Sequence, residues 1–195
     1  FLRQPVFVEE ERKPTAAEQG TAVHTLLYHL DLTSPPTERT IGETVQSLVE
    51  RHLLTPKQGQ VIPIEPLAHF FGTELGERLC HAAAEKNLWR EWSFTLGLPR
   101  RRLGTLLHGG DEDWDPTEMA DDDVIVVQGT IDAVWREEGK LYLLDYKTAR
   151  VSGEALIRRY RPQLSIYALA LEKITGLRPV QGYLAHLRGK SAYYT

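Results

Sequence analysis

VIVVQGTIDAVWR (residues 124–136) and LYLLDYKT (residues 141–148) are the segments of this 195-residue chain that say most about its fold. Both segments are rich in β-branched, aromatic and other apolar residues, and they predict two strands. A hairpin is expected to join them through either a two-residue loop at Glu138-Gly139 or a four-residue loop over 137–140. Both loops give the strands the same antiparallel register.

In that register Asp132 lies directly opposite Asp145, and Lys147 shares a face of its strand with Asp145. The strand around Asp145 is otherwise nearly apolar, which suits burial on both faces, where an unpaired carboxylate is unfavourable. Two opposed carboxylates have Cβ atoms roughly 5 Å apart and repel each other. Ordinary surface charge is the alternative interpretation, and the apolar setting of Asp145 weighs against it.

A divalent cation between Asp132 and Asp145 would turn their repulsion into attraction. Oxygen ligands with at most one imidazole suit Mg²⁺ or Mn²⁺ better than Zn²⁺, which prefers cysteine and histidine. Lys147 would then lie near a metal-activated water or near a phosphate that the water attacks. The hairpin therefore predicts a magnesium or manganese site.

Residues 1–87 predict a mostly helical region ahead of the hairpin. Capping boxes formed by Thr15 with Glu18 and by Thr40 with Glu43 mark the starts of two helices. Apolar residues at helical spacing predict three helices in this region, at about 15–33, 40–53 and 67–84.

Residues 88–195 predict the sheet. Beside the hairpin, strands are expected over 88–98 and 180–187, and an acidic loop over about 109–123. A helix is expected over 152–175, with a break at Pro162 as an alternative, and Gly176 ends it. The chain is thus expected to form one domain of the α/β (α+β) class, with a central mixed sheet flanked by helices.

Composition narrows the class of protein. The net charge of −4 at first argues against a nucleic-acid partner. However, residues 111–123 hold eight acidic and no basic side chains, and residues 147–195 hold nine basic and two acidic ones, so the end of the chain is basic.

The single cysteine, Cys80, excludes a disulfide or a multi-cysteine metal site within this chain and favours a reducing, cytoplasmic setting. The sequence contains no membrane-spanning run, no secretion signal and no phosphate-binding loop for ATP. A start at Phe1, with Met119 as the one methionine, predicts a fragment of a larger polypeptide.

Three motifs now carry a resemblance. Gly129-Thr-Ile-Asp132, Asp145-Tyr-Lys-Thr148 and Tyr160-x-x-Gln163-x-x-x-Tyr167 follow one another in the order typical of the RecB-type nuclease family of the PD-(D/E)XK superfamily, which the chain resembles from about residue 14 to its end. The upstream Gly20-Thr-Ala-Val-His24 is similar to the His motif of that family. Pro5-Val-Phe7 ahead of this helix looks most like the carboxy-terminal nuclease domain of AddA-type (UvrD/Rep-like) helicase–nuclease subunits. The resemblance implies a restriction-endonuclease-like core.

The resemblance also implies site residues. Asp132 and Asp145 would be catalytic metal ligands, and Lys147 would be the catalytic lysine. His24 and the backbone carbonyl of Tyr146 would complete the metal site, although a lone histidine beside an apolar stripe is more often structural. Glu91 occupies the place of a semi-variable strand carboxylate and is a possible further ligand.

The helix after the lysine is implied to bind DNA or to support the site. Gln163 and Tyr167 match the helix motif of the family, and Tyr160 shares their face, where core packing explains the tyrosines equally well. Basic residues would follow the DNA backbone without sequence preference, and these are Arg150, Arg158, Arg159 and Arg161. The cluster at 100–102 is either a surface cluster or a phosphate contact.

By resemblance, the chain is expected to hydrolyse DNA phosphodiester bonds with Mg²⁺, or with Mn²⁺. The implied substrate is single-stranded DNA, delivered by a helicase motor of the parent chain during double-strand-break repair and recombination, and the implied partner is a second helicase–nuclease subunit. The alternative is a nuclease-like domain that has lost catalysis and only binds DNA or a partner subunit; the intact Asp/Asp/Lys set argues against it. Relatives that carry an iron–sulfur cluster are excluded, because Cys80 alone cannot hold one.

Overall fold

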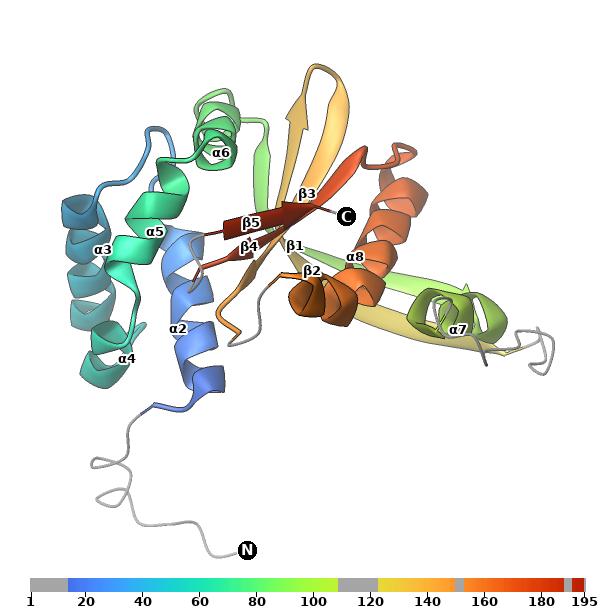
Figure 1. The fold of residues 1–195 in the computed structure, drawn as a ribbon, viewed down its shortest axis with the longest axis horizontal. Helices are drawn as coiled ribbons and strands as arrows, with labels where there is room; N and C mark the ends of the chain where they lie inside the picture. Colours follow the sequence, from blue (N-terminus) through green and yellow to red (C-terminus); the bar gives the residue numbers. More distant parts are fainter. Residues whose placement is uncertain (1–13, 109–122, 150–152, 188–190, 195) are drawn as a thin grey trace, which may run out of the picture.

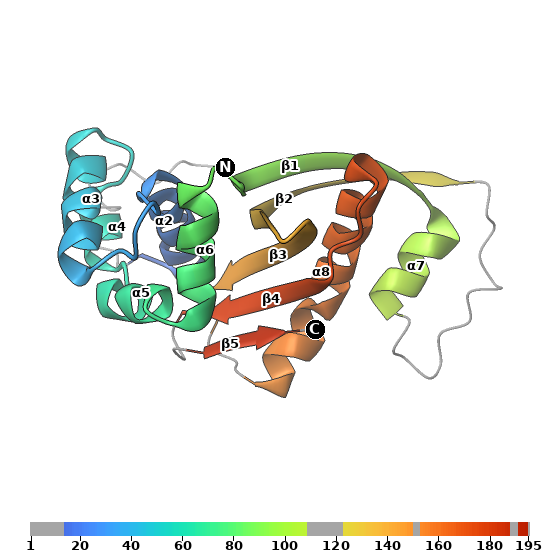
Figure 2. The same cartoon turned by 90° about the horizontal axis from the view of Figure 1, so that it is seen from above.

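The computed structural model of the chain describes residues 14–108, 123–149, 153–187 and 191–194, which form a mixed five-stranded sheet with helices on both faces (Figures 1 and 2). The strands follow one another in sequence order as β1 (Leu88–Pro99), β2 (Val124–Glu137), β3 (Lys140–Lys147), β4 (Gln181–His186) and β5 (Ser191–Tyr194). β1, β2 and β3 form an antiparallel meander, β4 runs parallel to β3, and β5 runs antiparallel to β4. The predicted α/β class and mixed sheet are confirmed, whereas β5, a strand of 4 residues, has no counterpart among the predicted strands.

Helices from the first half of the chain gather on one side of the sheet (Figure 2). They are α2 (Ala16–His29), α3 (Glu38–Glu50), α4 (Pro56–Gln60), α5 (Ile64–Phe71) and α6 (Glu74–Ala84). α8 (Glu154–Thr175) covers the other face and makes the crossover that the parallel pair β3 and β4 requires. α7 (Arg100–His108) lies beside α8, next to the far end of β1 and β2. None of the helices in the described ranges is long and apolar enough to cross a membrane.

A separate hydrophobic core lies on each face of the sheet. Trp135 and Tyr146 belong to the core beneath the N-terminal helices, and Phe94 and Leu143 belong to the core beneath α8. Each large apolar side chain that is fully buried stabilises the fold by about 1.5–3 kcal/mol. Both helical layers are therefore held against a common sheet, with α2 on one face and α8 on the other.

The first predicted helix begins as expected, and the second begins earlier. The Thr15 hydroxyl accepts a hydrogen bond from the Glu18 amide at 3.2 Å, and the Glu18 carboxylate accepts one from the Thr15 amide at 2.6 Å. The prediction that Thr40 caps the next helix is wrong, because Thr37 is the N-cap and the Thr40 hydroxyl accepts from the Thr37 amide at 2.9 Å. Thr40 thus supplies the third helical position of a box that starts three residues earlier.

The predicted helix over 67–84 is two helices, α5 and α6, because Thr73 caps a new helix. The two cross so closely that a Cβ atom on Gly76 would lie 2.3 Å from the Phe70 carbonyl oxygen. The last helix, α8, runs unbroken through Pro162 and ends as predicted at Gly176, whose φ of 74° is left-handed. Most of the predicted acidic loop lies outside the described residues, as does Pro5-Val-Phe7.

The central hairpin has the shorter of the two predicted loops. Glu138 (φ 50°) and Gly139 (φ 77°) form a two-residue turn between the paired residues Glu137 and Lys140. The predicted register is confirmed from this turn to the pair Ala133 and Leu144, where the β2–β3 pairing ends. Asp132 and Asp145 would form the next pair in the predicted register, but the described β2–β3 ladder does not include them.

The sheet forks at Asp132. β1 and β2 stay paired as far as Pro99 and Val124, and they leave β3 as a two-stranded ribbon. Ile131 packs under α8 and Ala133 packs under the N-terminal helices, although residues two apart in a regular strand share a face. The opposite residue on β1, Glu91, has a left-handed φ of 51° and is missing from the ladder between the paired Arg90 and Trp92. Both strands therefore change faces in one row, and this row is where the predicted site residues lie.

Candidate active site

Three acidic residues lie in one row across the fork. Glu91 of β1 and Asp132 of β2 occupy the unpaired row between Arg90–Ala133 and Trp92–Ile131. Asp145 of β3 lies in the continuation of that row, one step beyond the last β2–β3 pair. The structure thus brings Asp132 and Asp145 together as predicted, but at the point where their strands separate.

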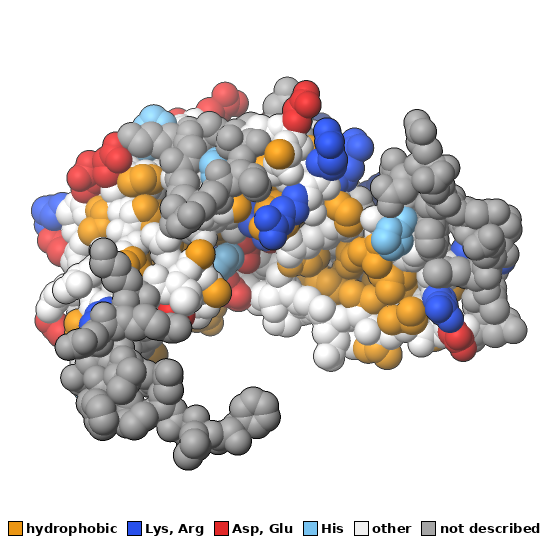
Figure 3. Space-filling view, turned by 60° about the horizontal axis from the view of Figure 1, so that its bottom comes forward, with side chains coloured by type: hydrophobic (Ala, Val, Ile, Leu, Met, Phe, Trp, Pro, Cys, Tyr) orange, Lys and Arg blue, Asp and Glu red, His pale blue; other side chains and the backbone are white. Residues whose placement is uncertain are grey.

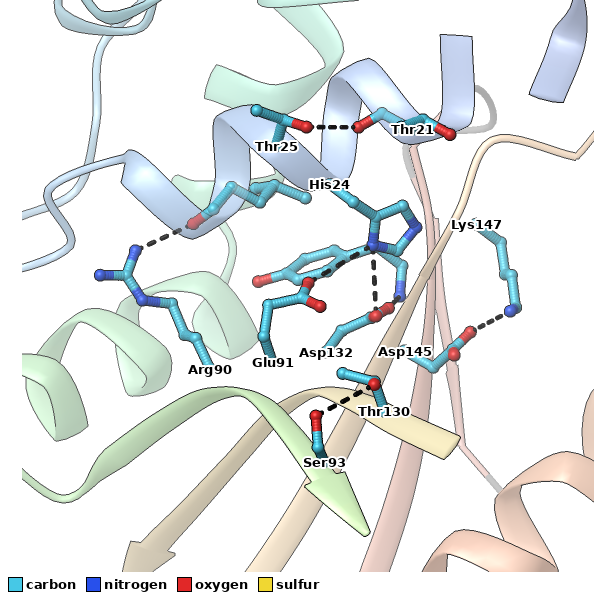
Figure 4. Close-up of polar contacts among 12 residues, drawn as sticks. Thr21, His24, Thr25, Arg90, Glu91, Ser93, Thr130, Asp132, Asp145 and Lys147 are labelled. Carbon is cyan, nitrogen blue, oxygen red and sulfur yellow. Dashed lines mark hydrogen bonds and ion pairs between the residues drawn. The ribbon is translucent and has the colours of Figure 1, made fainter. Parts of the chain in front are cut away.

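His24 reaches this row from α2, which crosses above the fork (Figure 4). Its Nδ1 atom lies 3.2 Å from Asp132 Oδ1 and 3.9 Å from Glu91 Oε1. His24, Glu91 and Asp132 each offer a ligand atom within 4.8 Å of the others. The side chains of His24 and Glu91 are about one-third exposed, at 35% and 36%, so this cluster opens to solvent.

The backbone of β3 orients the Asp132 carboxylate. The Tyr146 amide donates to Asp132 Oδ2 at 2.6 Å, which leaves Oδ1 directed at His24. The Tyr146 ring is buried in the core beneath the N-terminal helices, and it lies edge-on to the Phe70 ring with 5.7 Å between the ring centres. Tyr146 therefore supports the site through its amide, while the predicted use of its carbonyl as a metal ligand stays a prediction.

The site carries negative charge that its own cations do not balance. Burial, and then the nearby Asp132 carboxylate, raises the pKa of Asp145. Burial and Asp132 likewise raise the pKa of Glu91, and the hydrogen bond with Asp132 raises the pKa of His24. The shifts of Asp145 and Glu91 record the cost of bringing ionised carboxylates together in a partly buried place, and the shift of His24 records the attraction of these carboxylates for a cation. One imidazole and several carboxylate oxygens form a donor set that fits a hard divalent cation.

Lys147 lies beside this cluster, held by three contacts. Its Nζ atom lies 2.5 Å from Asp145 Oδ2, donates to Gln163 Oε1 at 3.1 Å and lies 4.2 Å from the centre of the Tyr160 ring. The side chain is only 15% exposed, so the ammonium group is positioned rather than freely solvated. A positioned cation next to a metal site can stabilise negative charge that develops on a phosphate.

The Tyr/Gln/Tyr face of α8 supports Lys147. Gln163 also donates from Nε2 to the Tyr167 hydroxyl at 2.6 Å, and Tyr167 is buried edge-on against Phe94. A Cβ atom on Gly129 would lie 2.8 Å from the Phe94 ring and 3.4 Å from Tyr167. Gly129 therefore leaves room for the Phe94 and Tyr167 rings, whose packing holds Gln163 in place. Tyr160 and Tyr167 thus both pack in the fold and contact the residues of the site.

Two residues that position the site have no counterpart in the predictions. Arg90, next to Glu91, donates to the carbonyl oxygens of Leu27 and Leu30 at 2.9 and 2.6 Å, which ties β1 to the end of the helix that carries His24 (Figure 4). His186 is the register partner of Lys147 on β4, and its Nε2 lies 2.8 Å from the Ala149 carbonyl oxygen. Neither spacing nor composition marks these residues, because both act through the main chain of distant segments.

The predicted DNA-binding arginines separate in space. Arg159 lies over the Tyr160 ring at 5.5 Å, on the side of Lys147, and Arg158 and Arg161 are exposed. Arg150 lies outside the described residues. The cluster at 100–102 forms the start of α7 and belongs to neither the metal cluster nor the lysine contacts. On the face drawn in Figure 3, Lys and Arg side chains lie close to acidic and histidine side chains near the middle of the molecule.

Comparison with known proteins agrees with this geometry. A family model described as the PD-(D/E)XK nuclease superfamily matches residues 1–195. Three similar proteins each bear the name of the A subunit of an ATP-dependent helicase/nuclease. The protein of Moorella thermoacetica is 36% identical over 189 residues, covering 97% of this chain and 13% of the relative. That of Bacillus pumilus is 39% identical over 184 residues, covering 88% of this chain and 14% of the relative. That of Bacillus velezensis is 35% identical over 204 residues, covering 100% of this chain and 15% of the relative.

These matches confirm the resemblance drawn from the motifs. They also set its extent, because the chain spans only about one-seventh of the length of the relatives, from 13% to 15%.

Proposed function

The chain belongs to the PD-(D/E)XK nuclease superfamily, and on that basis we propose that it hydrolyses DNA phosphodiester bonds with the help of a divalent cation. The observation that carries this proposal is the cluster of His24, Glu91 and Asp132 directly beside the Asp145–Lys147 pair. Nuclease function in this superfamily is consistent with the names of the relatives.

The donor set decides which cation the site would hold. His24, Asp132 and Asp145 are the proposed ligands, with Glu91 as a further one and the Tyr146 carbonyl as a backbone ligand. Because most of these donors are oxygen atoms, Mg²⁺ fits best and Mn²⁺ is the expected substitute. When bound, such an ion acts as a Lewis acid on the phosphate and lowers the pKa of an attacking water.

The residues of the chain have separate tasks. Asp132 is fixed by the Tyr146 amide, so one of its oxygens always faces His24 and the open side of the cluster. Asp145, Gln163 and Tyr160 hold the Lys147 ammonium group next to that opening. Lys147 would neutralise the negative charge that builds up on the phosphate as the water attacks, and would orient that water by donating a hydrogen bond.

The substrate and the partners are proposed by similarity. The relatives are named as helicase/nuclease subunits, which suggests a helicase motor in the parent chain that delivers single-stranded DNA to this site. A role in double-strand-break repair, a cytoplasmic location and a second helicase–nuclease subunit complete the proposal. Contacts to the strand would be made to phosphates, and would therefore carry no sequence preference.

Cleavage of labelled single-stranded DNA tests the proposal. The chain is incubated with Mg²⁺, with Mn²⁺ or with EDTA, beside Asp145→Asn and Lys147→Met, and Glu43→Gln on the exposed face of α3 serves as a control. Cleavage is expected only with a metal ion, and only for the wild type and the control. Equal cleavage by all four proteins would contradict the proposed roles of Asp145 and Lys147. No cleavage by the wild type under any condition would contradict the proposal as a whole and favour a domain that only binds DNA.

A further inference from the structure

A cleft of about 380 Å³ lies on the side of α8 away from the Lys147 contacts. α8 forms one wall, α7 and the segment between α8 and β4 contribute to the other, and Leu143 of β3 lies at the floor with Leu164. Its volume falls in the range of ligand sites, roughly 300–1,000 Å³. Apart from Arg161, which is predicted to contact the DNA backbone, the described residues that line it have no part in the function proposed above.

Three guanidinium groups from three different segments converge on this cleft. Arg102 comes from α7, Arg161 from α8 and Arg178 from the segment that follows α8, while Glu172 is the one acidic residue in the described lining. Across the described parts of the chain none of these four side chains has an ion-pair partner, although Arg39 and Arg78 do. Converging cations without counter-charges raise the local potential and attract an anion. Guanidinium groups favour phosphate in particular, because their donors match its oxygens in pairs.

The cleft begins beside the active site and leads away from it. Arg161 is two residues from both Arg159 and Gln163, and residues two apart in a helix point to nearly opposite sides. Arg159 and Gln163 therefore lie on the flank of α8 that faces Lys147, and Arg161 opens the other flank. From Arg161 to Glu172 the cleft follows α8 for about 16 Å, at 1.5 Å per residue.

We propose that this cleft holds a second stretch of the DNA strand whose other part lies at the active site, and that it binds the strand through its phosphates. The inference rests on the proposed function, since it takes DNA as the substrate. Among the described residues, the lining contains no aromatic side chain on which a base could stack, which argues for backbone contacts and against base recognition. The length of the cleft, and its three arginines without an ion-pair partner among the described residues, suit a run of several phosphates better than a single free anion.

Binding of fluorescent oligothymidylate in EDTA, measured by anisotropy over a range of salt concentrations, tests the cleft without cleavage. The triple variant Arg102→Gln, Arg161→Gln, Arg178→Gln is compared with a control that loses the same charge elsewhere, Arg51→Gln, Arg136→Gln, Lys140→Gln. A 20-nucleotide strand is expected to bind the cleft variant at least about tenfold more weakly, with a salt slope lower by about 2, because each phosphate contact to a single strand contributes about 0.7. An affinity and a slope equal to those of the control would overturn the proposal.

Glu172→Gln gives an effect of the opposite sign, which misfolding cannot imitate. It removes the acid of the cleft and should tighten binding of the 20-mer roughly two- to threefold. Unchanged or weaker binding would contradict a phosphate site.

Two further probes identify the ligand. An abasic deoxyribose-phosphate 20-mer should show the same loss in the cleft variant as oligothymidylate, since the contacts are made to phosphates. If instead poly-glutamate binding depends on the three arginines and oligothymidylate binding does not, the cleft serves an acidic protein segment and the proposal is wrong.

Cleavage kinetics separate this proposal from the proposed function. With Mg²⁺, the double variant Arg102→Gln, Arg178→Gln, which keeps Arg161, should show a raised KM for the 20-mer at an unchanged kcat, and unchanged cleavage of a tetranucleotide too short to reach the cleft. A chain that binds DNA through the cleft in EDTA but never cleaves would contradict the proposed function and leave the cleft supported.

Discussion

The two ends of the β2–β3 hairpin differ in how their ionised side chains are compensated. At the turn end, Glu137 of β2 receives the guanidinium group of Arg78 from α6, which also lies 4.8 Å from the centre of the Tyr142 ring and donates to the Tyr183 hydroxyl at 3.1 Å. At the fork end, Asp132 faces Asp145 and Glu91, with His24 and Lys147 as the nearby cationic groups.

The direction of the pKa shifts shows at which end the carboxylates have a compensating positive charge. The hydrogen bonds with Arg78 lower the pKa of Glu137, and those with Glu137 raise the pKa of Arg78, so each favours the ionised form of the other. Burial, and then repulsion by the Asp132 carboxylate, raises the pKa of Asp145 and of Glu91. One end is stabilised by opposite charges within the chain, and the other keeps a repulsion between carboxylates that the proposed cation would relieve.

Asp132→Asn should have the largest effect on function and a small one on stability. The amide keeps an oxygen that can accept from the Tyr146 amide, but the ligand charge is lost. We expect cleavage to fall by about 10³-fold or more, in keeping with the loss of a group that acts electrostatically at a reacting centre. In EDTA the thermal midpoint should stay the same or rise, because repulsion with Asp145 is relieved. A large drop in stability would mean that the fork is a structural centre.

Lys147→Met separates catalysis from metal binding. The substitution removes the ammonium group that Asp145 and Gln163 hold and keeps much of the apolar stem. Cleavage should fall by about 10²–10³-fold, while Mn²⁺ affinity measured by calorimetry should be retained or increased, because a competing cation has gone. Loss of Mn²⁺ binding would show that Lys147 organises the ligands.

Arg78→Met tests the turn end of the hairpin, where Arg78 compensates the charge of Glu137. It removes the ion pair with Glu137 and the contact over Tyr142, and we expect unfolding in urea to become easier by about 1–3 kcal/mol. Arg39→Met, which removes an exposed pair with Glu43, is the matched control and should cost no more than about 0.5 kcal/mol. Mn²⁺ affinity should be unchanged in both variants. A change in Mn²⁺ affinity in Arg78→Met would show that the two ends are coupled.

Glu91→Gln is expected to have the smallest effect at the fork. Its Oε1 lies at 3.9 Å from His24 Nδ1, farther than Asp132, and its side chain is one of the most exposed in the cluster. Mn²⁺ should bind only about threefold more weakly, an effect of about 0.7 kcal/mol, and cleavage at saturating metal should fall only a few-fold. A loss as deep as that of Asp132→Asn would make Glu91 an equal ligand.

The sequence predicts much of this comparison because the relevant signals are local. Runs of β-branched, aromatic and other apolar residues mark β2 and β3, the turn residues set their register, and an ionisable Asp145 inside an apolar strand marks the site. The spacing of Tyr160, Gln163 and Tyr167 gives the face of α8 that contacts Lys147.

What the sequence does not predict depends on contacts between distant segments. The fork arises because β1 and β2 change faces together at Glu91 and Asp132, and no local pattern signals a paired change of this kind. Arg90 and Arg78 act on helices and strands far from them in the chain, so their partners appear only in the folded structure. The capping error at Thr40 has a simpler cause, since two threonines three residues apart both fit a helix start.

Titration calorimetry of Mn²⁺ into the wild type and into Asp132→Asn, at the same pH and salt concentration, tests the central claim most directly. The account predicts saturable binding by the wild type, at least about tenfold weaker binding by the variant, and a thermal midpoint that rises with Mn²⁺ in the wild type alone. Equal binding by both proteins, or no binding by the wild type, would contradict the claim that the fork holds a divalent cation.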